Sequence, residues 1–307
     1  MKHQLSGFVC CLLLALAGAA SPAKADLVGG VNVIAAWHRL PGQYSDIENP
    51  ERGKVMALDP YAIKRGMRFK RLYDVQYGEK RAYMGIPLTA LMGAYKHRGN
   101  HQFAILHFEH GMQVPIRISD IKRLDLFLAT ETCRTRAADC TTTFEAVERR
   151  DVYGEEEDPR PLGFSWNKLV VSKRWHPGTR VEEPTGFLPW MHVGTLTGIE
   201  FADEGAYNAQ FVVGTSGGEK IFQKRCQYCH GARSVGARFG WDFVSPLPLY
   251  EKRPVDNLLN HVKYRKAMAQ QMGIQMPPQK DFEPEEVQML WQWMRDVARQ
   301  PLKRYTP

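Results

Sequence analysis

Five consecutive residues in the last third of the chain have types and a spacing that could do specific chemistry. They are Cys226-Gln227-Tyr228-Cys229-His230, a Cys-x-x-Cys-His pattern of the kind that attaches a haem covalently. On one helical turn the two thiols can reach the two vinyl groups of one porphyrin, and the next residue presents an imidazole to the iron. The pattern therefore predicts covalent haem attachment at Cys226 and Cys229, with His230 as an axial iron ligand.

Two other interpretations of a Cys-x-x-Cys pair remain open at this point. A thioredoxin-like redox pair usually needs a βαβ context and has no use for the histidine. A zinc site needs about four ligands, and the chain contains no second Cys-x-x-Cys. Both alternatives explain fewer of the five residues than haem attachment does.

The residues before and after this motif resemble the class I cytochromes c. Gly218 and Phe222 precede Cys226 as in that family's N-terminal helix, Gly-x-x-x-Phe-x-x-x-Cys-x-x-Cys-His-Gly, and Gly231 completes the pattern. Leu290 and Trp293 resemble the apolar-aromatic pair of the family's last helix. The resemblance covers residues 216–299 and implies that this pair packs across Gly218.

The second iron ligand is also implied by the resemblance. Met276-Pro277-Pro278 is similar to the Met-Pro-Pro loop that supplies it in the family, so Met276 is expected opposite His230. Met272 and His261 are the alternatives. His/Met ligation raises the reduction potential. With both axial positions filled by protein, the iron has no open site for substrate, and one-electron transfer is the expected chemistry.

The N-terminus has the pattern of a secretory signal peptide. Lys2 and His3 precede an apolar run over residues 8–20, and Ala23-Lys24-Ala25 reads as a cleavage site. The run is shorter than the roughly 20 residues of a membrane-spanning helix, which is the alternative. We therefore expect periplasmic localisation and no membrane span after cleavage. In an oxidising compartment Cys133 and Cys140 are expected to form a local disulfide.

Composition and charge exclude one class of protein and indicate the kind of partner. The mean hydropathy of −0.40 excludes a polytopic membrane protein, and 307 residues suggest about two domains. Of the net charge of +8, residues 216–307 carry most, with 15 Lys/Arg against 9 Asp/Glu. This favours a redox protein partner with an acidic docking surface over nucleic acid; a solvated basic surface is the alternative. Six basic residues could ring the haem edge: Lys224, Arg225, Arg233, Lys263, Arg265 and Lys266.

The region before the haem motif loosely resembles the sulfite-oxidase-like molybdopterin-binding fold. The similar segments are residues 83–91, 108–116, 169–171 and 187–201. Only Cys133 or Cys140 could supply that family's molybdenum thiolate, and we expect the two to pair with each other. The resemblance therefore implies an α+β, mostly β, domain without molybdopterin that serves as a docking or partner-binding module.

The sequence thus predicts a multidomain chain: a signal peptide over residues 1–25, an α+β sulfite-oxidase-like domain over 26–211, and an all-α domain with one covalent haem c over 212–307. The alternative is a haem-containing oxidoreductase whose N-terminal domain binds a metal or molybdopterin and oxidises a small molecule. A haem-based sensor is a third possibility. Four histidines lie close together in the sequence: His97, His101, His107 and His110. Some of them are candidate metal ligands; the alternative is that they are surface or core histidines without a metal.

Hydrophobic patterning predicts the elements that position these residues. Helices are expected over 216–225, 254–271 and 281–299, and strands over 103–108, 169–171 and 195–201. Residues 112–118 contain Pro115, which cannot donate a backbone hydrogen bond, so they are expected to form an edge strand or a strand end. Residues 202–217 are expected to be a connection.

Overall fold

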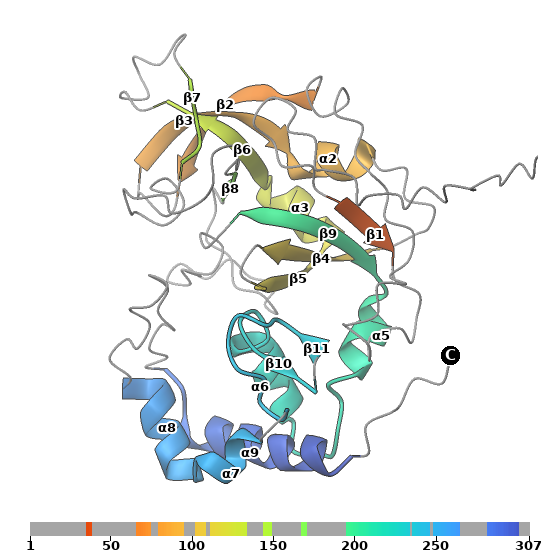
Figure 1. Cartoon of the computed structure of the whole chain (residues 1–307), viewed down its shortest axis with the longest axis vertical. Helices are drawn as coiled ribbons and strands as arrows, with labels where there is room; N and C mark the ends of the chain where they lie inside the picture. Colours follow the sequence, from red (N-terminus) through yellow and green to blue (C-terminus); the bar gives the residue numbers. More distant parts are fainter. Residues whose placement is uncertain are drawn as a thin grey trace, which may run out of the picture.

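The computed structural model describes eleven segments of the chain: residues 35–38, 66–74, 79–94, 102–108, 111–133, 144–148, 167–170, 195–233, 235–245, 248–264 and 281–300. Residues 35–202 of this set form two β-sheets, which we call the β region. The helices α6 to α9 lie below the sheets in Figure 1. Within the described residues, no helix combines the length and the apolar character needed to cross a membrane.

The β region is mostly antiparallel. One sheet has the strand order β1-β9-β4-β5, in which only β1 and β9 run parallel, and the other has the order β2-β3-β6-β7, with β8 also paired to β6. The strands are β1 (Ala35–His38), β2 (Arg68–Asp74), β3 (Glu79–Pro87), β4 (Phe103–Phe108), β5 (Gln113–Arg117), β6 (Phe127–Thr132), β7 (Glu145–Ala146), β8 (Lys168–Val170) and β9 (Leu196–Ala202).

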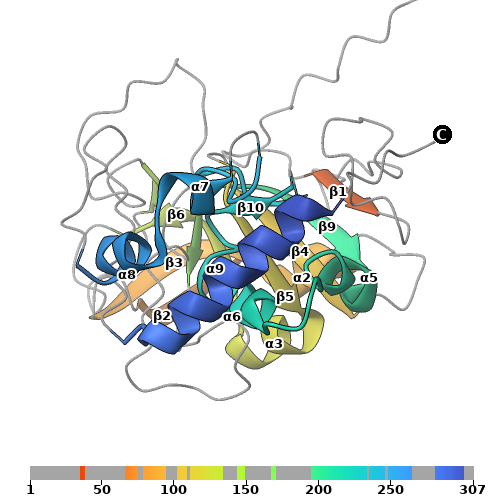
Figure 2. The same cartoon turned by 90° about the horizontal axis from the view of Figure 1, so that it is seen from below.

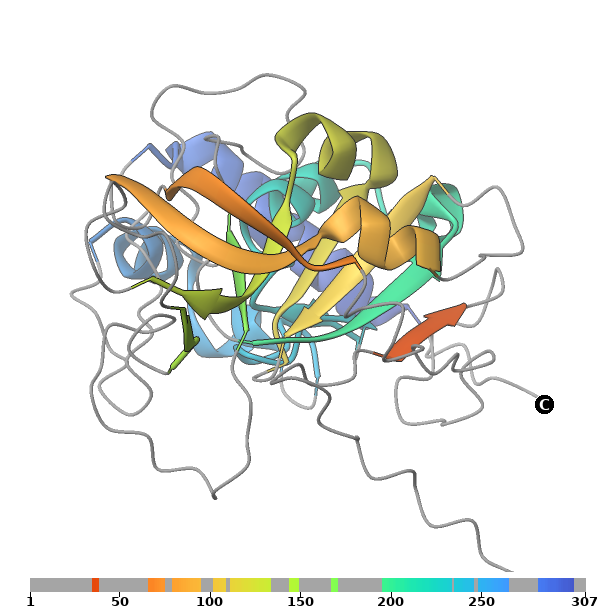
Figure 3. The same ribbon diagram turned by 90° about the horizontal axis from the view of Figure 1, so that it is seen from above.

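One hydrophobic core joins the two sheets. It contains Ile86 of β3 and Leu128 of β6 from one sheet, and Leu106 of β4 and Ile199 of β9 from the other. Two short helices, α2 (Leu88–Ala94) and α3 (Ile118–Leu124), add further apolar side chains to it. In Figure 3 the β2–β3 hairpin crosses in front of the four-stranded sheet. The predicted mostly β region is therefore confirmed; its sulfite-oxidase-like topology stays a prediction.

The predicted edge strand is confirmed. Residues 113–117 form β5, at the outer edge of the four-stranded sheet, with Pro115 opposite Ile105 of β4. The predicted strands 103–108 and 195–201 correspond to β4 and β9, which pair antiparallel. Cys133 is buried after β6, whereas Cys140 lies outside the described residues, so the disulfide between them also stays a prediction.

The C-terminal part of the chain is mainly helical. Its elements are α5 (Glu204–Ala209), α6 (Gly218–Arg225), β10 (Gly231–Ala232), β11 (Val235–Gly236), α7 (Leu249–Lys252), α8 (Val255–Tyr264) and α9 (Pro284–Arg299). The predicted helices at 216–225 and 281–299 are confirmed as α6 and α9. The third is confirmed as far as Tyr264, beyond which residues 265–280 are not described. The small β10–β11 hairpin departs from the all-α expectation.

The prediction that residues 202–217 only connect the two parts was wrong in part, because they contain α5. Asp203 caps this helix, since its side chain accepts a hydrogen bond from the Ala206 amide at 2.6 Å. Tyr207 on the same helix is 1% exposed and packs against Phe103 and Phe211, with ring centroids 5.5 and 5.4 Å away. This aromatic contact anchors the helix between β4 and the helical part.

Helices α6 and α9 cross in close contact (Figure 2), as the family resemblance predicts. A Cβ atom added at Gly218 would lie 2.5 Å from Cβ of Trp293, so the two helices meet where α6 has no side chain. Trp293 is fully buried, stacks on Phe222 at 4.8 Å between ring centroids, and donates from Nε1 to the Phe211 carbonyl at 2.8 Å. The crossing fixes the direction in which α6 leads into the haem motif.

Candidate haem site

The Cys-x-x-Cys-His motif continues α6 by one turn. Cys226 is the C-terminal cap of the helix, and its carbonyl accepts hydrogen bonds from the amides of Cys229, at 3.2 Å, and His230, at 2.9 Å. Both thiols are free, and Cys226 is buried. The structure therefore brings the three predicted residues together on one compact turn, the arrangement that the spacing was expected to produce.

His230 is held by the backbone of a following loop. Its Nδ1 lies 2.8 Å from the carbonyl oxygen of Trp241. Because a carbonyl can only accept, Nδ1 must carry the proton, and the ring lone pair is then on Nε2. A metal-binding histidine typically donates its other ring N–H to a carbonyl or carboxylate in this way, which fixes its tautomer and orientation. His230 thus has the tautomer that iron ligation through Nε2 requires.

The loop around His230 is itself fixed. The Asp242 side chain accepts from three backbone amides through Oδ1: Arg233 at 3.1 Å, and Val244 and Ser245 at 2.8 Å each. This carboxylate therefore holds the segment that carries the Trp241 carbonyl. Asp242 was not predicted from the sequence, where its only signal was a carboxylate between Trp241 and Phe243, in a stretch without apolar periodicity.

The imidazole fits against two residues of the same loop. Phe243 lies 4.8 Å from it, centroid to centroid. At Gly240 an added Cβ would be 2.4 Å from Cε1 of His230, so only glycine allows the ring this position. Of the aromatic residues near the motif, Phe243 contacts the His230 ring. The Trp241 side chain is 77% exposed, and only the backbone carbonyl of this residue reaches His230.

The electrostatics of the two thiols argue against a thioredoxin-like pair. Burial raises the pKa of both Cys226 and Cys229 to about 12, so both are neutral thiols near pH 7. A catalytic redox pair needs a thiol whose pKa is lowered. Among the described residues no group of three or more His, Cys, Asp and Glu side chains could hold a metal ion, which leaves the zinc interpretation without further ligands there.

Of the other predicted iron ligands, the structure describes only the backbone position of His261. Met276 and its alternative Met272 lie outside the described residues, and His261 is on α8.

Of the four clustered histidines, His107 is described: its Nε2 lies 2.9 Å from Oε2 of Glu200, a buried residue of β9. His107 is therefore part of a polar pair between neighbouring strands. His97, His101 and His110 lie outside the described residues.

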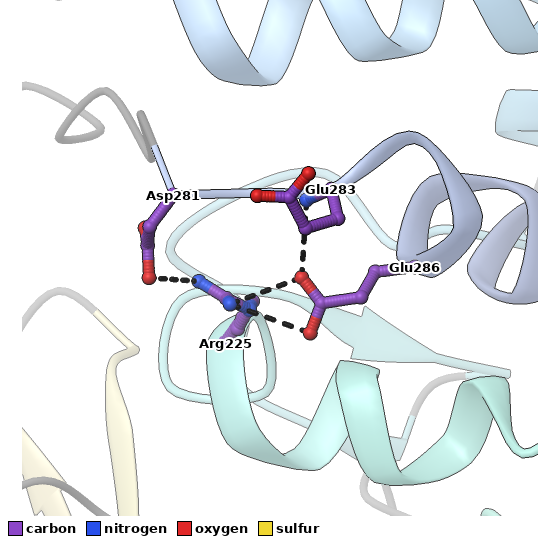
Figure 4. A network of polar contacts seen from close by, with 4 residues as sticks. All are labelled: Arg225, Asp281, Glu283 and Glu286. Atoms are coloured by element: carbon purple, nitrogen blue, oxygen red, sulfur yellow. Dashed lines mark hydrogen bonds and ion pairs between the residues drawn. The ribbon is translucent and has the colours of Figure 1, made fainter.

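Arg225, directly before Cys226, ties the motif to the start of α9 (Figure 4). Its guanidinium lies 3.1 Å from Oδ2 of Asp281 and 3.0 Å from Oε2 of Glu286, and it sits 4.8 Å above the ring of Phe282. The side chain is 9% exposed. The suggestion that Arg225 rings an exposed haem edge was therefore wrong: the acidic residues at the start of α9 draw it inward.

We expect Arg225→Met to lower the free energy of unfolding by about 1–3 kcal/mol, because it leaves the Glu286 carboxylate without its fork-shaped partner. The exposed position of Asp281 limits that part of the loss. Arg299→Met removes an exposed cation at the other end of α9 and should change the value by less than about 0.5 kcal/mol. Equal denaturant midpoints for the two variants would contradict this role of Arg225.

Comparison with known proteins identifies the segment that contains the motif. Residues 214–294 match the family model described as cytochrome c oxidase, cbb3-type, subunit III. No curated protein matches the chain. The matched segment contains α6, the haem motif and most of α9, so the C-terminal segment is of cytochrome c type. A cytochrome c domain implies a haem c cofactor, haem-based electron transfer and redox partners.

Proposed function

We propose that this chain is an exported c-type cytochrome that transfers single electrons through one covalent haem. The observation that carries the proposal is the hydrogen bond from His230 Nδ1 to the Trp241 carbonyl, on the same turn as two free thiols, of which Cys226 is buried. When bound, the haem iron supplies the reversible one-electron step. Cys226 and Cys229 hold the porphyrin through thioethers, and His230 binds the iron through Nε2.

The remaining parts of the proposal extend the family resemblance. Met276 would supply the second iron ligand. The signal peptide over residues 1–25 directs the chain to the periplasm. The β region serves as a docking or partner-binding module, and the excess positive charge of residues 216–307 favours a partner with an acidic surface.

The attachment itself can be tested on the full chain, exported into a periplasm with haem maturation. Wild type should keep its haem through denaturing electrophoresis, as detected by peroxidase staining and by intact mass. Replacing both Cys226 and Cys229 with alanine should abolish covalent haem, because no thiol of the motif remains. Cys140→Ala, outside the motif, should keep it. A colourless wild-type protein, or covalent haem in the double variant, would end the proposal.

The second ligand is tested separately. Met276→Ala should abolish the methionine-to-iron charge-transfer band of the ferric protein and lower the reduction potential, since a soft thioether stabilises ferrous iron. Met272→Ala is the matched control and should keep the band. If the band survives in Met276→Ala and disappears in Met272→Ala, the ligand assignment is reversed while haem attachment stands.

A further inference from the structure

The first residue of β5 is hydrogen-bonded to the haem motif on the outer edge of the sheet. The Gln113 amide donates to the Tyr228 carbonyl at 3.2 Å, so an edge-strand donor is satisfied by the turn between the two cysteines. The next outward-facing position of the strand is Pro115, which has no amide hydrogen. A second backbone hydrogen bond, from Arg238 to the Gly111 carbonyl at 2.7 Å, joins the β4–β5 turn to the loop after the motif.

Side-chain packing extends this contact. Tyr228 is 2% exposed and belongs to the hydrophobic core of the β region, with Met112 and Val114 among its other members. Its hydroxyl donates to the Gln223 carbonyl of α6 at 2.9 Å. The Tyr228 ring thus lies in the core of the β region, while its hydroxyl is hydrogen-bonded to α6 of the helical part. Figure 1 shows β4 and β5 directly above α6 and β10.

The two haem-attaching thiols belong to different hydrophobic clusters. Cys229 packs, with Phe239, against the core of the β region. Cys226 belongs to a second cluster, which holds Phe222 and Trp293 of the helical part together with Phe103 and Ile105 of β4. A haem bonded to both sulfurs is therefore attached on one side to a residue that the β region holds.

We propose that the β4–β5 hairpin is part of the haem site, with Tyr228 and Gly111 as positioning residues that hold the Cys226–His230 turn against the edge of the sheet. This inference rests on the proposed function. The contact covers part of the Cys229 side of the turn, and a less hydrated surround favours the less charged ferrous haem. The β region therefore raises the reduction potential of a haem that it does not itself ligate.

The test uses the haem-loaded full chain and two substitutions. Tyr228→Ala removes the ring from the β-region core. Gly111→Ala introduces a Cβ atom 3.2 Å from Cβ of Arg238, at a backbone φ of +81°. Tyr228→Phe retains the ring and serves as the conservative rescue. Gly93→Ala is the matched control for the glycine, because nothing lies within 4 Å of the added Cβ atom.

Of three readouts, two are expected to change together in Tyr228→Ala and Gly111→Ala. Covalent haem remains, the reduction potential falls, and the amides of Gln113 and Arg238 exchange with deuterium about tenfold faster or more. The Leu128 amide of β6 should keep its wild-type exchange rate. Tyr228→Phe and Gly93→Ala should keep both the potential and the exchange rates of wild type.

Other outcomes discriminate between the two proposals. Wild-type potential and exchange rates in a haem-loaded Tyr228→Ala would overturn the positioning role and leave the proposed function intact. A wild type without covalent haem would overturn the proposed function. If Tyr228→Ala does not fold, Gly111→Ala decides the question by the same readouts, and an unchanged potential in that variant rejects the inference.

Discussion

Gly218→Ala should lower the free energy of unfolding of the helical part by about 3 kcal/mol or more. The added Cβ atom would lie 2.3 Å from the Met289 carbonyl oxygen and 2.5 Å from Cβ of Trp293, so α6 and α9 would have to separate. Alanine is the better helix former by about 1 kcal/mol, and a destabilised variant would show that the close helix contact outweighs this preference.

Denaturant unfolding followed by Trp fluorescence measures this effect. Gly93→Ala, in the exposed part of α2 where the added methyl has free space, should be neutral or slightly stabilising. Covalent haem in Gly218→Ala should remain detectable where the protein folds, because the thiols themselves are unchanged. A Gly218→Ala midpoint equal to that of the control would show that the α6–α9 contact is looser than the structure has it.

Gly240→Ala should disrupt iron ligation by His230. The new Cβ atom would be 2.4 Å from Cε1 and 2.5 Å from Nδ1 of the imidazole, so the ring must turn and lose its hydrogen bond to the Trp241 carbonyl. The thioethers of Cys226 and Cys229 do not depend on this ring. We therefore expect covalent haem with an altered absorption spectrum and a shifted reduction potential, which separates attachment from ligation.

Trp241→Phe is the control for this substitution. The Trp241 side chain is exposed and lies 5.0 Å from the Lys252 ammonium, whereas His230 uses only the backbone carbonyl. The variant should keep the wild-type spectrum and potential. An unchanged spectrum in Gly240→Ala would show that the His230 imidazole tolerates the methyl group, and would contradict the close packing of Gly240 against this ring.

Together these contacts show how one turn is held from several sides. Arg225 ties its beginning to α9, Tyr228 its middle to the β region, and Trp241 its final histidine to the following loop. Each contact uses a different interaction: an ion pair, apolar packing, and a hydrogen bond from a side chain to a backbone carbonyl. Because the three contacts have different partners, the substitutions proposed for them should differ in which readout changes most: stability, potential or spectrum.

Local sequence patterns were sufficient to predict several helices and strands. Pro115 predicted the edge strand, because a proline cannot donate a backbone hydrogen bond. The helix crossing at Gly218 was implied by the family resemblance, through the pair Leu290 and Trp293. The three motif residues came from spacing alone. In contrast, α5 was missed, because its stability comes from the Asp203 cap and from aromatic contacts with residues distant in sequence.

For the haem site, too, local sequence patterns predicted one part, and long-range packing decided the other. The residue types of the Cys226–His230 motif and its flanks were enough to predict haem attachment, since that chemistry depends on thiols and an imidazole one helical turn apart. The variable positions of the motif carried no such information. That Tyr228 enters the β-region core, and that Arg225 faces α9 rather than solvent, depends on which surfaces pack against the turn, and such long-range packing cannot be read from local spacing.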